Sequence, residues 1–143
     1  MRKVIFFLLS IIGIIIALIL LYIFVIVSNE YSRKTYNYEI FNVENFIVSF
    51  LAYLALYFGN EWYLNALKAG KDILNGQLLM GIGVILLSII IYLNVKKTSL
   101  SYGLIMGFVA EILYLAATPL VFFAFIMMMA YFGQAKPVYN IND

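Results

Sequence analysis

The chain has 143 residues, of which 66% are hydrophobic, 17% aromatic and 11% charged, and its mean hydropathy is +1.03. Soluble domains carry roughly 45–50% apolar and about 25% charged residues, so this composition indicates a single-domain, all-α, polytopic integral membrane protein. The chain has no cysteine and no histidine. This excludes disulfides, thiolate nucleophiles, Cys–zinc sites and imidazole ligands, so we expect no cofactor and no metal site.

The charge balance is small, and its placement suits a membrane. Nine Lys and Arg against seven Asp and Glu give a net charge of +2, too small to indicate nucleic-acid binding. Basic pairs beside apolar runs are typical of anchors at membrane edges. With four spans, one side carries Arg2, Lys3, Lys68, Lys71 and Lys136, and the other carries Arg33, Lys34, Lys96 and Lys97. Five against four gives almost no orientation bias, and we place both termini in the cytoplasm.

The first predicted span covers residues 4–27, an apolar run interrupted by Ser10 and Gly13. A span needs about 20 residues, so this run is long enough to cross with some tilt. A secretory signal peptide is the alternative interpretation, but its apolar region is about 7–15 residues and no small-x-small cleavage site follows. We therefore expect an uncleaved helix. Residues 28–43 are polar and rich in tyrosine, and they predict a long loop at the headgroup region.

The second predicted span covers residues 45–67, with Asn42 as its N-cap. Residues 60–74 predict an amphipathic extension of this helix, which the dipeptide Asn75-Gly76 ends. Its polar face holds Glu61, Asn65, Lys68 and Asp72, followed by Asn75, and its opposite face holds Trp62, Ala66, Ala69 and Ile73. Such a segment either lies in the membrane interface or docks on a partner.

The third predicted span covers residues 77–95, ends at Lys96-Lys97 and forms a tight antiparallel hairpin with the fourth. Stripes of small residues predict contacts between helices, because helices in lipid associate by close backbone approach. These stripes are Ser10, Gly13 and Ala17 in the first span, Ser49, Ala52 and Gly59 in the second, and Gly81 and Ser88 in the third.

The fourth predicted span covers residues 100–132 and would be roughly 50 Å long, well beyond the hydrocarbon core. The dipeptide Thr118-Pro119 interrupts it without any loop-forming residues around it. Because proline removes a backbone donor and clashes one turn back, we expect one long helix with a kink just before Pro119. Residues 134–143 form a short polar tail.

One face of this fourth helix carries the chain's mid-span carboxylate. Gly103, Gly107, Glu111, Tyr114 and Thr118 follow steps of four, four, three and four residues. Gly103 and Gly107 form a small-xxx-small motif, which predicts close helix packing. A charge at mid-bilayer costs about 3 kcal/mol on insertion scales, so Glu111 must face protein or water. Tyr114 and Thr118 are expected to donate hydrogen bonds to it.

Glu111 permits two interpretations. It is either protonated and hydrogen-bonded to a neighbouring helix, or it is the proton- or cation-coupling site of a channel or transporter. An enzyme is not expected, since Glu61 and Asp72 lie roughly 16 Å apart along a helix, too far to act together.

The leading functional hypothesis is a small non-enzymatic subunit of a larger complex in a bacterial-type inner membrane. Its expected partners are the lipid bilayer and other membrane subunits or copies of itself. A homo-oligomeric channel or small transporter using Glu111 is the alternative. A membrane immunity or protective protein is the third hypothesis.

Overall fold

The computed structural model describes residues 2–134 and consists of four α-helices. These are α1 (Arg2–Tyr36), α2 (Val43–Lys68), α3 (Leu74–Lys97) and α4 (Leu100–Gln134). All four are long and apolar enough to cross a membrane. The prediction of an all-α chain with four such helices is therefore confirmed, and these features are typical of a multi-pass membrane protein.

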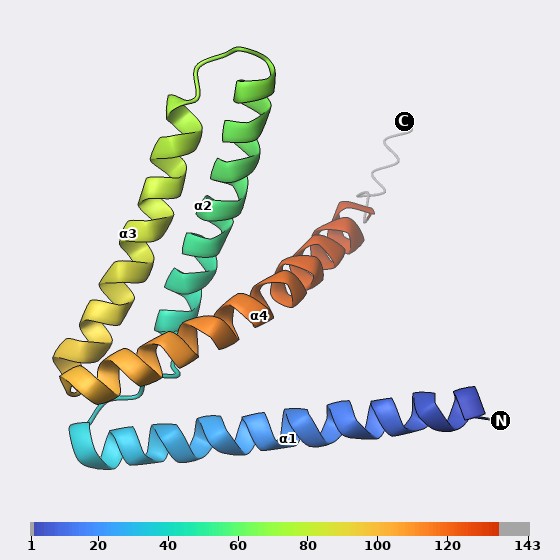
Figure 1. The fold of residues 1–143 in the computed structure, drawn as a ribbon, viewed down its shortest axis with the longest axis vertical. Helices are drawn as coiled ribbons and strands as arrows, with labels where there is room; N and C mark the ends of the chain where they lie inside the picture. Colours follow the sequence, from blue (N-terminus) through green and yellow to red (C-terminus); the bar gives the residue numbers. More distant parts are fainter. Residues whose placement is uncertain (1, 135–143) are drawn as a thin grey trace, which may run out of the picture.

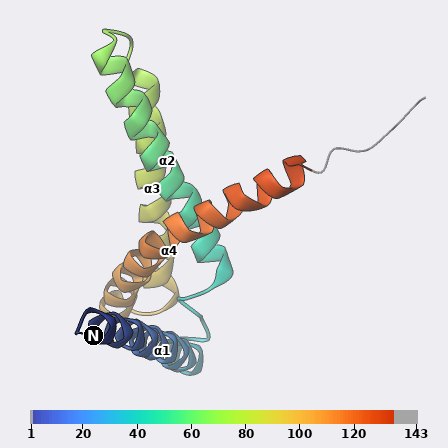
Figure 2. The same cartoon turned by 90° about the vertical axis from the view of Figure 1, so that its right-hand side faces the viewer.

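The helices diverge from one common end, so that the molecule resembles an open fan. The C-terminal ends of α1 and α3 lie beside the N-terminal ends of α2 and α4 (Figure 1). From this end the α2–α3 hairpin, α4 and α1 point in different directions, as the second view also shows (Figure 2). If the four helices cross a bilayer in alternating directions, the helix ends that meet here all lie on the same side of it.

The first connection is shorter than the sequence predicts. Residues 28–43 were expected to form a loop, but α1 continues to Tyr36 and leaves only residues 37–42 outside helices. Two contacts explain the extra turns. Lys34 Nζ pairs with Glu30 Oε1 at 2.6 Å, one helical turn apart, and the ring of Tyr36 stacks on that of Tyr102. Hydropathy does not detect such contacts, which is why the helix end was misplaced.

The connecting residues 37–42 are fixed against the helices on both sides. The Asn29 side chain exchanges two hydrogen bonds with the Phe41 backbone, of 2.6 and 3.0 Å. The Asn42 side chain caps α2 by accepting from the Asn45 amide at 2.7 Å, as predicted for an N-cap. Between them Ile40, only 1% exposed, packs against Ala110 and Tyr114 of α4. This segment therefore belongs to the core.

α2 and α3 pack as an antiparallel hairpin with close backbone contact (Figure 1). A Cβ atom on Gly76 would lie 2.6 Å from the Tyr63 amide nitrogen, and one on Gly83 would lie 2.8 Å from the Ala52 carbonyl oxygen. Both positions therefore require glycine. Ser49, Ala52 and Gly59 are buried. In α3, however, the contacting glycines are Gly76 and Gly83, whereas the expected Gly81 has open space around it and Ser88 is exposed.

The predicted amphipathic helix over residues 60–74 is wrong in its last third. α2 ends at Lys68, and Gly70 adopts φ +62°. The Gly70 amide donates to the Leu67 carbonyl and the Lys71 amide donates to the Ala66 carbonyl, which together form a Schellman motif. Asn75-Gly76 lies inside α3 and is not a stop signal, because Gly76 is required by helix contact instead.

α4 is one helix from Leu100 to Gln134 with Pro119 inside it. The kink expected before Pro119 stays a prediction. The predicted polar tail lies, from residue 135 onward, outside the described residues.

Candidate functional site

The carboxyl group of Glu111 lies between α4 and α2 and is held by two side chains of α2. Glu111 is 6% exposed. Ser49 Oγ donates to Glu111 Oε1 at 2.9 Å, and Tyr53 Oη lies 2.9 Å from Oε2 and 3.0 Å from the Glu111 backbone oxygen. Ser49 and Tyr53 are one helical turn apart, so both reach the same carboxyl. Each carboxyl oxygen therefore has a partner inside the chain.

The two contacts of the Tyr53 hydroxyl constrain where protons can be. A phenolic hydroxyl has one proton, so it donates fully to one acceptor. If it donates to the Glu111 backbone oxygen, the contact with Oε2 is a hydrogen bond only when Oε2 carries a proton and donates to Oη. A neutral carboxyl thus satisfies all three contacts. If the carboxyl is ionised, its Oε2 and the Glu111 backbone oxygen share the single proton of the Tyr53 hydroxyl.

Tyr114 and Thr118 do not bind this carboxyl, contrary to the prediction. Tyr114 Oη lies 3.3 Å from the Ile40 carbonyl and 3.4 Å from that of Asn42, and so ties α4 to the connecting segment. Thr118 Oγ1 donates to the Tyr114 carbonyl one turn back, at 2.8 Å. Sharing a helix face places these side chains in line with Glu111, but their hydroxyls reach other acceptors.

A second polar cluster joins α2 and α3 at the end where the helices converge. It consists of Tyr38, Asn45 and Asn94. Tyr38 Oη donates to Asn94 Oδ1 at 2.9 Å, and Asn45 Nδ2 donates to Tyr38 Oη and to the Ile40 carbonyl, each at 3.0 Å. Asn94 is fully buried, and within residues 2–134 its Nδ2 has no hydrogen-bond partner. The cluster fixes the beginning of α2 against the end of α3.

Gly103 and Gly107 lie on the face of α4 that meets the end of α3. A Cβ atom on Gly103 would lie 2.5 Å from Val95 Cα, while one on Gly107 would lie 3.4 Å from Asn94 Nδ2. Gly103 is thus the tighter contact. Close approach at these glycines leaves Asn94 facing the backbone of α4.

Beyond this contact α4 turns away from α2, and an apolar cleft of about 490 Å³ opens between them. Tyr53, Thr118, Pro119 and Phe122 are among its lining residues. Tyr53 therefore has two environments, with its hydroxyl on Glu111 and its ring on the cleft.

The four polar residues predicted on the amphipathic face are all exposed: Glu61, Asn65, Lys68 and Asp72. On the opposite face Ala66 is buried, but Trp62 is 52% exposed. Asp72 lies in the turn, where its Oδ1 accepts from the Leu74 amide at 2.9 Å. These residues lie in the last turns of α2 and in the turn to α3, whereas Glu111 contacts α2 nearer its beginning, at Ser49 and Tyr53.

The residues that the sequence analysis missed are Tyr53, Asn45 and Asn94. Ser49 was identified only as a small residue for packing. A tyrosine or asparagine inside an apolar helix needs a hydrogen-bond partner, and Tyr53 follows Ser49 by one turn. That spacing was the available signal. Within the part of the chain described, no three Asp or Glu side chains lie close enough to hold a metal ion.

Comparison with known proteins gives no relative from which a function could be transferred. The sequence matches no protein-family model, and no curated protein or solved structure resembles it significantly.

Proposed function

We propose that the chain is a non-enzymatic subunit of a larger membrane assembly, in a bacterial-type inner membrane, and that α1 carries its contact with other subunits. The observation that carries this proposal is the isolation of α1. Every residue from 6 to 24 is exposed, and the described contacts of α1 with the rest of the chain lie toward its C-terminal end.

The direction of α1 supports an external partner. It diverges from the α2–α3 hairpin (Figure 1), so that residues 6–24 lie apart from the other helices described. A helix that is apolar on all sides suits a spanning position and not the membrane surface. The fan leaves the exposed length of α1 free to contact helices of another subunit.

The bonding of Glu111 favours a structural role for this carboxyl. Both of its oxygens have partners within the chain, and the group joins α2 to α4. A buried polar group satisfied in this way stabilises one helix arrangement.

Photo-crosslinking tests the assembly. A crosslinking amino acid at Ile15 of α1 is compared with the same group at Ile85 of α3, which is also exposed. We expect Ile15 to capture the same foreign membrane protein reproducibly and in stoichiometric amount, and Ile85 to capture lipid. Crosslinks from Ile15 to copies of this chain would favour a homo-oligomer instead, and equal capture from both positions would contradict a role specific to α1.

A second candidate is a proton- or cation-coupling channel or transporter, favoured by the cleft beside Tyr53. The Tyr53 ring lines this space of about 490 Å³, and its hydroxyl contacts the Glu111 carboxyl. Ion flux into liposomes tests it. Glu111→Gln cannot release a proton, so it abolishes flux if Glu111 couples ions, and the exposed control Glu61→Gln does not.

A further inference from the structure

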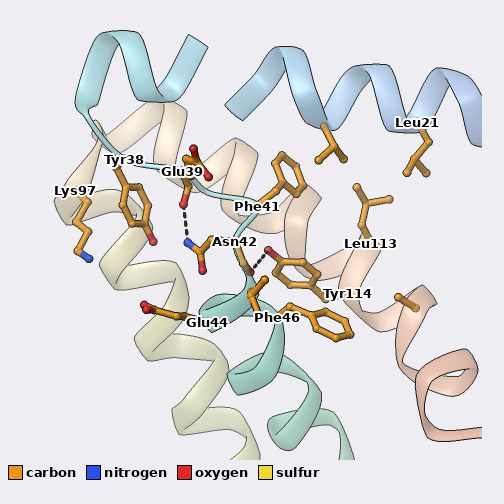
Figure 3. A pocket seen from close by; sticks show the side chains of 13 residues that line it. Leu21, Tyr38, Glu39, Phe41, Asn42, Glu44, Phe46, Lys97, Leu113 and Tyr114 are labelled. Carbon is orange, nitrogen blue, oxygen red and sulfur yellow. Dashed lines mark hydrogen bonds between the residues drawn. The ribbon is translucent and has the colours of Figure 1, made fainter. Parts of the chain in front are cut away.

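An open cleft of about 880 Å³ lies between α1, the connecting segment, the beginning of α2 and α4. Its lining changes from charged to apolar along its length (Figure 3). Lys97, Tyr38 and Glu44 lie toward one end, while Leu21 and Leu113 lie toward the other. The cleft is thus amphipathic, with its charges at the converging end of the helices.

The charges at this end include one cation and one anion without a partner. Lys97 Nζ lies 4.8 Å from the centre of the Tyr38 ring, a cation–π contact that holds the ammonium at the cleft. Within residues 2–134 neither Lys97 nor Glu44 forms an ion pair, whereas Glu39 is paired with Arg33 at 3.4 Å. A ligand that satisfies both free charges must itself carry both signs.

We propose that this cleft binds a zwitterionic phospholipid whose headgroup contains a phosphate and a primary ammonium. The phosphate binds Lys97, the ammonium donates to the Glu44 carboxylate, and one acyl chain lies along Leu21 and Leu113. An anionic lipid has no cation in its headgroup, so it would leave the Glu44 carboxylate without a partner. A quaternary ammonium has no N–H to donate to a carboxylate, so the choline headgroup lacks the second charge-assisted hydrogen bond.

The site requires the arrangement of α1, the connecting segment, α2 and α4 described above, but it does not require another subunit. A negative crosslinking result would therefore not contradict the lipid site. A negative lipid titration would likewise not contradict the proposal of a larger assembly.

Native mass spectrometry of the full chain in detergent micelles tests the site. The protein is titrated with phosphatidylethanolamine, phosphatidylglycerol and phosphatidylcholine of matched acyl chains, and with soluble phosphoethanolamine. We expect the ethanolamine lipid to bind about tenfold more tightly than either other lipid, because it alone makes both charge-assisted hydrogen bonds. Preference for phosphatidylglycerol, equal binding of all three lipids, or equally tight binding of phosphoethanolamine would overturn the proposal.

Variants assign the two charges. Lys97→Gln should weaken binding of the ethanolamine lipid about tenfold, while the control Lys96→Gln, on a side chain that lies over Tyr92 outside the cleft, should not. Glu44→Gln should weaken the ethanolamine lipid and remove its advantage over phosphatidylglycerol. Equal effects of the two lysine variants would contradict the site.

A third variant keeps every charge and fills the apolar part of the cleft. Ala117→Phe places a ring on the α4 wall of the cleft, and we expect loss of the ethanolamine lipid with unchanged helix content and gel-filtration profile. Undiminished binding by this folded variant would show that the acyl chain lies elsewhere and would refute the assignment.

Discussion

Gly59 of α2 and Gly76 of α3 face each other at backbone contact distance. A Cβ atom on Gly59 would lie 3.0 Å from the Gly76 carbonyl oxygen, and one on Gly76 would lie 2.8 Å from that of Gly59. Since both obstacles are backbone atoms, a side chain at either position has to push the helices apart. This pair sets the spacing of the hairpin.

Gly76→Ala should therefore open the hairpin near its tip. A displaced contact in a packed interface costs about 1–3 kcal/mol. The chain has no natural cysteine, so a cysteine introduced at the buried Ala66 can report opening through its thiol-labelling rate in increasing SDS. The matched control is Gly81→Ala on the same helix, where a Cβ atom meets nothing within 4 Å. Equal labelling rates in the two variants would show that the seam tolerates a methyl group.

Glu111→Ala should destabilise the contact between α2 and α4 more than Glu111→Gln does. Alanine leaves the Ser49 hydroxyl without its acceptor and removes the contact of the Tyr53 hydroxyl with the carboxyl, at about 1–3 kcal/mol, whereas glutamine keeps an acceptor and the side-chain length. The midpoint of thermal unfolding in detergent measures the difference, with Glu61→Gln as the exposed control. Equal losses for the two variants would show that the hydrogen bonds of this side chain to Ser49 and Tyr53 do not stabilise the contact.

Removing one member of the polar cluster should loosen the converging end of the fan. Asn45→Ala deletes the donor to Tyr38 and to the Ile40 carbonyl, and hydrogen bonds between membrane helices average about 0.6 kcal/mol each. We expect a lower midpoint of thermal unfolding in detergent and faster hydrogen exchange of the backbone amides at positions 42 and 45. The exposed Asn65→Ala serves as control. Unchanged exchange at the start of α2 would mean that packing of Ile40 alone fixes this segment.

Gly70→Ala should weaken the turn between α2 and α3, because its φ of +62° lies in the left-handed region. The cost for an L-residue there is about 1–2 kcal/mol, and Asn tolerates the conformation better than Ala. Gly70→Asn is thus the rescuing variant, and thiol labelling at Ala66→Cys is again the measure. If the two variants behave alike, another part of the turn determines its shape.

The number and approximate position of the helices could be predicted from the sequence, because apolar runs of sufficient length have no other use in a bilayer. Ends and contacts could not be predicted in the same way. α1 passes the expected boundary at Ser28 because Tyr36 packs on Tyr102, which is 66 residues away by the numbering. Gly76 was interpreted as a stop because glycine serves both turns and close helix packing.

At the candidate site, too, the contacts could not be predicted from the sequence. Glu111 was predicted from its cost in lipid to face protein or water, and its carboxyl lies between α2 and α4. Its partners could not be identified from α4 alone, since Tyr114 and Thr118 share its face but donate elsewhere. Only the register of α2 against α4 selects Ser49 and Tyr53, and that register depends on contacts distant in the sequence.

The fan arrangement also has a consequence for the order in which the chain assembles. The hairpin of α2 and α3 depends on contacts within residues 43–97, which can form before α4 has been synthesised. By contrast, α1 waits for partners that come late, because Ser28 and Tyr36 bind Tyr102 and Ser99. Contacts between neighbouring segments form faster than those between distant ones. We therefore expect the hairpin to fold first, while α1 is joined to it only through the connecting segment until α4 arrives and closes the converging end.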